Sequence, residues 1–244
     1  MNRLTEPADL EAALDDVSAL GPFFAATANP AEEVDPSWRP LRQLYTDPAG
    51  MLARYRQVAS ALDTDNERVV ASIAHQGLVA RVISPLIGVA SVHRIVPNWS
   101  PDSVHWRFAA TGSWPLWIAG ATPGPVDPAS LAPAVLDQAV PHLVGLESVV
   151  RATASVSART LRGNAASAVV AAGRLAAKSR PDAAGAASEV VDALLGSDPL
   201  RGAGVLGTGW AFRRRSCCLY YRIAGGGLCG DCVLAGRNRR SAAV

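Results

Sequence analysis

Four cysteines near the carboxyl end of this 244-residue chain are the residues whose type and spacing point most clearly to chemistry. They are Cys217, Cys218, Cys229 and Cys232, spaced C-C-x10-C-x2-C. Thiolates are soft ligands, and four of them complete either a tetrahedral Zn²⁺ site or a [2Fe–2S] cluster. The sequence therefore predicts that these four side chains converge on one metal centre.

Three uses of the four cysteines compete. Disulfide pairing is disfavoured, because the amino-terminal segment lacks the basic and apolar stretches of a secretion signal and cytoplasmic thiols stay reduced. Structural zinc ordinarily uses two C-x2-C knuckles, whereas here two adjacent cysteines replace one knuckle. The known ferredoxin spacings do not match either. Spacing alone leaves zinc and an iron–sulfur cluster as equal alternatives.

The residues around the cysteines predict a separate hairpin module. Leu219–Ala224 has the composition of a strand, and the three glycines at 225–227 favour a tight reversal that returns the first cysteine pair toward the second. Residues 201–244 carry eight arginines against Asp231 alone, a net charge of +7. We therefore expect a basic metal-binding module at 201–244 after a body at 1–200.

The body is predicted to be mostly helical. Helices are expected at Glu6–Ala19, Pro40–Leu62 (with a break at Asp47-Pro48), Asn66–Ile83, Leu131–Ser148, Val149–Lys178 and Ser188–Leu195. Pro85 is expected to end the third of these. Val104–Ala109 and Pro115–Ala119 have strand composition, whereas 123–128 predicts a linker and 202–208 a flexible junction. The class is α+β, predominantly helical, with a small antiparallel β portion and a C-terminal Cys-rich metal-binding hairpin.

Other polar and aromatic residues have structural explanations. The histidines lack the spacing of a metal pair, so we expect structural or surface roles for His75, His93, His105 and His142. Strand aromatics usually fill a core, which is the role expected for Trp99, Trp106, Trp114 and Trp117. The pair Gly163-Asn164 sits in a predicted helix although both residues are poor helix formers. It is expected to mark close packing against the cysteine module, and the alternative is a polar contact with the substrate.

Charge and hydropathy exclude two classes of protein. The net charge of +2 gives no global field for nucleic acid. The longest charge-free run, Phe108–Val126, contains three glycines and three prolines, which an ordinary membrane-spanning helix would not carry. We therefore expect a cytoplasmic protein with no membrane span and no nucleic-acid partner.

The cysteine spacing resembles the unusual [2Fe–2S] signature at the carboxyl end of the ferric-siderophore reductases, the FhuF-like family. The flanks RRRSCCLYYRI and LCGDCVL extend the similarity. Weaker matches lie upstream, in AHQGLVAR at 74–81, VHWR at 104–107 and LRGNAASA at 161–168. The similarity spans about residues 65–235, and Arg162 stands where the family commonly has tryptophan.

The resemblance implies a [2Fe–2S] cluster with Cys217, Cys218, Cys229 and Cys232 as its ligands and no catalytic residue beyond them. It implies one-electron reduction of Fe(III) in hydroxamate siderophores, which releases the metal because hard oxygen ligands hold Fe(III) far more tightly than Fe(II). No flavin or nicotinamide site is evident, so a separate electron-donor protein is expected.

A cluster that becomes more negative on reduction is sensitive to nearby cations. The candidates for tuning it, or for docking an acidic donor or an anionic ferric complex, are Arg213, Arg214, Arg215 and Arg222. The alternative is that these arginines are solvated surface charges that keep the protein soluble. The alternative from another class is a non-catalytic protein whose four cysteines bind a structural zinc. An iron–sulfur redox sensor would need a DNA-binding helix pair, which the sequence does not indicate.

Overall fold

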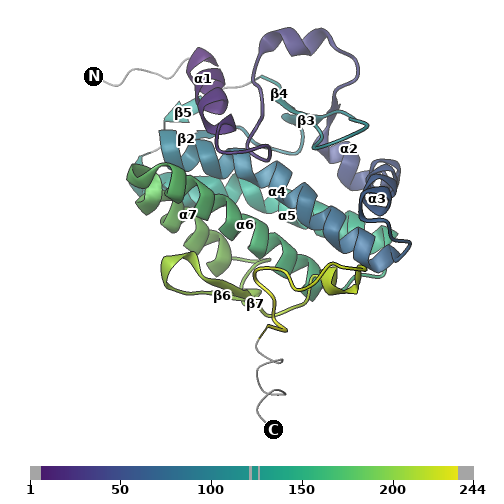
Figure 1. Ribbon diagram of the computed structural model, residues 1–244. Helices are drawn as coiled ribbons and strands as arrows, with labels where there is room; N and C mark the ends of the chain where they lie inside the picture. Colours follow the sequence, from purple (N-terminus) through teal and green to yellow (C-terminus); the bar gives the residue numbers. More distant parts are fainter. Residues whose placement is uncertain (1–6, 121–122, 126, 236–244) are drawn as a thin grey trace.

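The computed structural model describes residues 7–120, 123–125 and 127–235 (Figure 1). In this part of the chain the α-helices are α1 (Pro7–Ser18), α2 (Leu41–Thr46), α3 (Pro48–Leu62), α4 (Glu67–His93), α5 (Leu131–Thr153), α6 (Ala158–Ser179) and α7 (Ala184–Gly196). The strands are β1 (Arg39–Pro40), β2 (Ile95–Pro97), β3 (Val104–Trp106), β4 (Leu116–Ile118), β5 (Pro123–Pro125), β6 (Gly204–Leu206) and β7 (Phe212–Arg214). They form small antiparallel sheets in the orders β1-β3-β4, β2-β5 and β6-β7. The predicted class, α+β and predominantly helical, is confirmed.

Helix α4 is the centre of the fold. It crosses the middle of the molecule, with α5, α6 and α7 packed along it and α1 and α3 against its other sides (Figure 1). By length and composition it is long and apolar enough to cross a membrane, and 78% of its most apolar stretch is buried inside the protein. The core helix of a globular domain meets the same description.

The predicted end of this helix at Pro85 is wrong, because α4 continues to His93. A proline inside a helix removes one hydrogen bond and costs about 3 kcal/mol. Here every residue from 82 to 91 is buried, and burying each large aliphatic side chain contributes about 1.5–3 kcal/mol. Packing of Leu86, Ile87 and Val89 therefore outweighs the defect.

The boundary between the two long helices also differs from the prediction. The expected break after Ser148 is wrong, and α5 runs on to Thr153. The chain breaks at 154–157 because Ser157 caps α6, its side chain accepting a hydrogen bond from the Thr160 N–H at 3.2 Å. This cap sets where α6 begins.

Two segments predicted to be irregular contain strands. Within the expected linker at 123–128, β5 pairs with β2, and within the expected junction at 202–208, β6 pairs with β7. The strands predicted at Val104–Ala109 and Pro115–Ala119 are confirmed in shorter form as the antiparallel pair β3 and β4. Pairing across the chain, rather than local composition, makes β5 and β6 extended.

The tryptophans predicted as core are buried. Trp106 and Trp114 stack with ring centroids 4.6 Å apart, and the Trp99 indole donates to the Val82 carbonyl at 3.0 Å. His142, also buried, lies 2.6 Å from the Tyr45 hydroxyl through Nδ1 and 2.5 Å from the Trp99 carbonyl through Nε2. The structural role expected for this histidine is confirmed.

His142 makes the fold sensitive to acid. Burial lowers its pKa from 6.5 to about 4. Between these values the unfolded chain binds the proton and the folded chain does not, so stability is lost as pH falls from about 6.5 toward 4. The expected contribution of this one group to the slope is about 1.4 kcal/mol per pH unit. Urea unfolding followed by tryptophan fluorescence across this range measures it.

His142→Gln should be less stable at pH 7 and should show a shallower dependence of stability on pH than the wild type. A variant with the full wild-type slope would contradict the assignment.

Candidate metal centre

The chain enters the candidate site from β7 and forms an irregular loop, the cysteine segment (residues 215–235). The strand predicted at Leu219–Ala224 is wrong, because Tyr220–Arg222 forms one 3₁₀ turn, η5. Leu219 has a φ of 72°, which turns the backbone so that its N–H points at Cys217 Sγ, 3.3 Å away. Local hydrogen bonding to sulfur therefore overrides strand propensity here.

The glycine reversal after this turn is confirmed. Gly225 and Gly227 have positive φ values of 72° and 64°, and the Gly226 N–H bonds to the Ile223 carbonyl at 2.9 Å. Residues other than glycine rarely adopt such backbone angles. The reversal brings the second cysteine pair back toward the first.

The structure places all four cysteines in this segment as free thiols. Cys218 and Cys232 are buried, and Cys217 and Cys229 are half-buried. The Cys229 thiol donates to Cys218 Sγ, which lowers the pKa of Cys218 to about 6 and raises that of Cys229. The lowered pKa favours the thiolate form of Cys218, which is the form that binds metals.

The second pair has its own backbone donor, because the Leu234 N–H points at Cys232 Sγ at 3.3 Å. Among the described residues, no three His, Cys, Asp or Glu side chains are gathered around one point. Free thiols and N–H groups aimed at sulfur are chemically suited to holding a [2Fe–2S] cluster, in which four thiolates are divided between two irons.

A buried cation lies behind the cysteines. Arg214 is 1% exposed and donates to the side-chain oxygens of Asn164 and, at 3.4 Å, Gln76. In the described part of the chain it pairs with no carboxylate. Burial raises the pKa of Cys217, and the charge of Arg214 opposes part of this rise. The same charge adds to the lowering of the Cys218 pKa by the hydrogen bond with Cys229. Of the four arginines named from the sequence, Arg214 alone is buried.

Helices α4 and α6 supply polar contacts that fix the segment. Ser72 on α4 donates to the Cys218 carbonyl at 2.8 Å, and Ser167 on α6 donates to an Asp231 carboxylate oxygen at 2.5 Å. Asn164 joins the two helices through a 2.8 Å bond from its amide to the Ser72 carbonyl. The segment is thus held by both helices on the side of the cysteines.

The packing predicted for Gly163-Asn164 is confirmed. A Cβ atom added to Gly163 would overlap the hydroxyl of Ser216, the residue before the first cysteine. Arg162, which stands where the FhuF-like family commonly has tryptophan, instead pairs with Glu147 on α5 at 2.9 Å. Gly163 therefore lets the cysteine segment approach α6 closely.

Three side chains that support the site were not predicted from the sequence: Ser72, Gln76 and Ser167. Gln76 and Ser167 lie in the upstream stretches at 74–81 and 161–168, but a stretch of helix does not show which side chain faces the cysteines. The burial of Arg214, by contrast, could have been predicted from the alternation of side chains along a strand. In β7 the strand alternation buries Phe212 and Arg214 and exposes Arg213.

Comparison with known families confirms the resemblance for this segment. Residues 214–234 match the family described as the FhuF 2Fe-2S C-terminal domain, and this range includes all four cysteines. The match identifies a [2Fe–2S] cluster as the cofactor, as predicted. No curated protein matches the chain.

The close approach of Ser216 to Gly163 can be used to test whether contact with α6 holds the cysteine segment in position for the cluster. Gly163→Ala should push Ser216 away from α6 and lower the iron content of the purified protein, although alanine is the better helix former. Gly185→Ala on α7 is the matched control, because open space surrounds that glycine. Iron and sulfide assays and thermal unfolding measure both effects. Equal iron content in the two variants would contradict the seating.

Proposed function

We propose that this chain, whose residues 214–234 match a [2Fe–2S] domain, is an oxidoreductase that reduces ferric iron held in hydroxamate siderophores. The match over the four cysteines is the observation that carries the proposal. The reaction is a one-electron transfer that releases Fe(II) in the cytoplasm, and the electron comes from a separate donor protein. The ligands we propose for the cluster are Cys217, Cys218, Cys229 and Cys232.

A [2Fe–2S] cluster, when bound, supplies one-electron transfer with little change in structure. The chain's own residues would favour thiolate ligands and hold the cysteine segment in place. The Cys229–Cys218 hydrogen bond favours thiolate at Cys218, and the Leu219 N–H opposes the rise that burial causes in the pKa of Cys217. The Arg214 guanidinium offsets negative charge at the pair. Ser72 and Ser167 hold the loop against α4 and α6.

The chemistry of the substrate makes reduction equivalent to release. One electron from the donor protein reduces Fe(III) to Fe(II), and no bond to carbon forms or breaks. Hydroxamate oxygens hold the small, highly charged Fe(III) much more tightly than Fe(II), so the reduced metal dissociates and the free ligand takes protons from water.

Protein purified without oxygen should be brown and contain about two irons and two sulfides per chain. Dithionite should bleach it and produce a one-electron paramagnetic signal, and the reduced protein should convert a ferric trihydroxamate to Fe(II), trapped by a ferrous chelator. Visible absorption, EPR and metal analysis check the cluster.

Cysteine variants and zinc analysis control this experiment. Replacing both Cys229 and Cys232 with serine should abolish the visible absorption and the ferric reduction together. Reduction retained without the cluster would contradict the mechanism. A colourless wild-type protein with one zinc would support the non-catalytic zinc alternative instead.

The buried guanidinium should raise the reduction potential, because the site gains a negative charge on reduction. Arg214→Gln is expected to lower the midpoint potential by an amount on the order of tens of millivolts. Arg214→Lys keeps the charge and should recover part of that loss. Arg213→Gln, an exposed neighbour on the same strand, is the control. Equal shifts for Arg213→Gln and Arg214→Gln, measured by EPR-monitored redox titration, would overturn this role.

A further inference from the structure

We propose, resting on the function proposed above, that the ferric chelate binds in a cleft bordering the cysteine segment. Two hollows form this cleft. The larger, about 830 Å³, lies between α3 and the loop after β3, and the smaller, about 240 Å³, lies between α4 and α6. The larger alone has the size typical of small-molecule sites, about 300–1,000 Å³.

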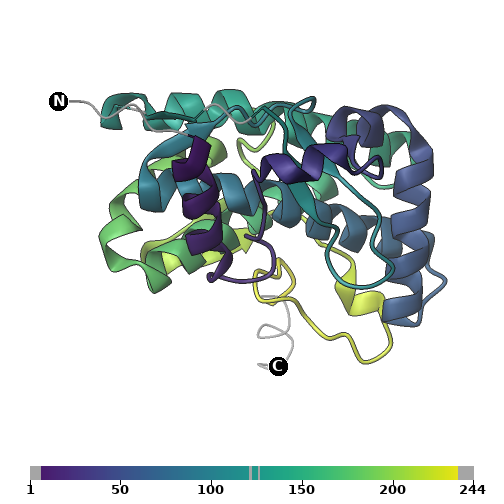
Figure 2. The same ribbon diagram turned by 90° about the horizontal axis from the view of Figure 1, so that it is seen from above.

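The two hollows adjoin at the turn after α1 and at α4. Pro22 lines the larger hollow, and its neighbour Phe23 lines the smaller one. A Cβ atom on Gly77, in the smaller hollow, would lie 3.9 Å from the guanidinium of Arg54, in the larger. Figure 2 shows the turn after α1, the loop after β3 and the cysteine segment reaching toward the same side of the molecule.

The smaller hollow reaches the supports of the cysteine segment. Gln76 and Ser167 line it, and the same two side chains bond to Arg214 at 3.4 Å and Asp231 at 2.5 Å. Asp231 lies between the second pair of cysteines. The smaller hollow therefore ends at side chains that hold the cysteine segment, and a chelate that spans both hollows would contact these supports.

The larger hollow presents hydrogen-bond donors suited to an oxygen-rich ligand. Arg54 is half-buried, donates to Gln57 at 3.2 Å and the Gly112 carbonyl at 3.1 Å, and has a buried Nε with no partner. Arg56 lines the same hollow. In the described residues neither arginine pairs with a carboxylate. Their guanidinium groups can donate to the oxygens that surround the ferric ion.

The smaller hollow presents an apolar wall to the arms of such a chelate. Phe23 and Leu175 are 40% and 38% exposed, and alanines of α4 and α6 line the rest of the wall. A polar end joined to an apolar wall matches a ligand with a charged, oxygen-rich centre and hydrocarbon linkers.

The rim of the cleft is already fixed by the protein. Arg81, buried on α4, donates to the Trp114 carbonyl at 2.7 Å and the Phe23 carbonyl at 3.3 Å, so it ties both rim loops to the core. Gln57 on α3 bonds to the Ala109 carbonyl at 2.5 Å. A preformed site loses less conformational entropy when the ligand binds.

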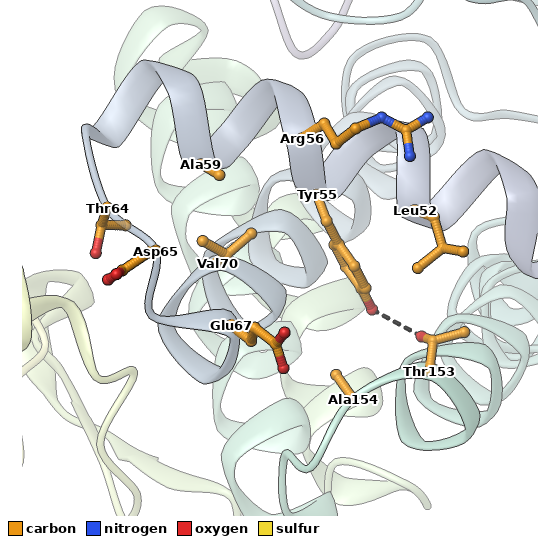
Figure 3. A pocket seen from close by; sticks show the side chains of 10 residues that line it. All are labelled: Leu52, Tyr55, Arg56, Ala59, Thr64, Asp65, Glu67, Val70, Thr153 and Ala154. Carbon is orange, nitrogen blue, oxygen red and sulfur yellow. Dashed lines mark hydrogen bonds between the residues drawn. The ribbon is translucent and has the colours of Figure 1, made fainter.

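A third hollow, of about 300 Å³ between α3, α4 and α5, suits this ligand less well (Figure 3). Tyr55 reaches across it to Thr153, 2.9 Å away. Arg56 lines this hollow too, but Asp65 and Glu67 also line it, and carboxylates repel the negative oxygens of a hydroxamate complex. The cleft that has Arg54 and no carboxylate in its lining is therefore the better match.

The test measures binding of a gallium(III) trihydroxamate to the protein with its cluster bound. Ga³⁺ resembles Fe³⁺ in charge and size but is not reduced, so calorimetry reports binding without turnover. Arg54→Gln should weaken binding about tenfold, as expected for loss of a hydrogen bond from a charged group. Gly77→Leu should weaken it at least about tenfold by filling the cleft, where a Cβ atom meets only the Arg54 guanidinium, at 3.9 Å.

Two controls and the cluster spectrum separate the outcomes. Arg151→Gln, exposed on α5, and Gly185→Leu, in open space on α7, should bind within about twofold of the wild type. All four variants should keep the visible spectrum of the cluster. Wild-type binding by Arg54→Gln and Gly77→Leu, with ferric reduction intact, would overturn the cleft and leave the proposed function standing. A holoprotein that neither binds the gallium chelate nor reduces the ferric one would overturn both.

Discussion

A guanidinium buried without a carboxylate is the constraint on which the carboxyl-terminal part of this structure depends. Removing a charge from water costs several kcal/mol even after relaxation, and the amide oxygens of Asn164 and Gln76 return only part of it. Negative charge on the cysteines, as in the cluster proposed here, would supply the kind of partner that this guanidinium lacks. Arg214 thus links the packing of α4 against α6 to the position of the cysteine segment, because it bonds to a side chain on each helix. Both are expected to depend on cofactor binding.

The helical body can be understood as the support for this arrangement. Small residues on α6 let it lie close to α4, and the two helices together present Ser72, Asn164 and Ser167 to one loop. The same pair of helices forms the wall of the smaller hollow. The part of the body that holds the cysteines therefore also borders the proposed chelate site.

The cysteine spacing, the helical class and the paired strands β3 and β4 were readable from the sequence, because each rests on local pattern. The continuation of α4 through Pro85 could not be predicted from the sequence, because it depends on burial of the helix on every side. The turn at Leu219 could not be predicted either, because it depends on a hydrogen bond to sulfur. Composition also made Arg213, Arg214 and Arg215 look alike, and only the pairing of β7 with β6 separates the buried one from its neighbours.

The Ser157 cap has a consequence for the electrostatics of the loop. Because the cap starts α6 at Ala158, the amino end of this long helix lies beside the cysteine segment, where Arg159 donates to the Arg215 carbonyl at 2.8 Å. Aligned peptide dipoles place about half a positive charge at such an end. The backbone of α6 therefore favours an added electron on the cysteine segment, independently of any side chain. Side-chain substitutions would leave this electrostatic contribution of the helix unchanged.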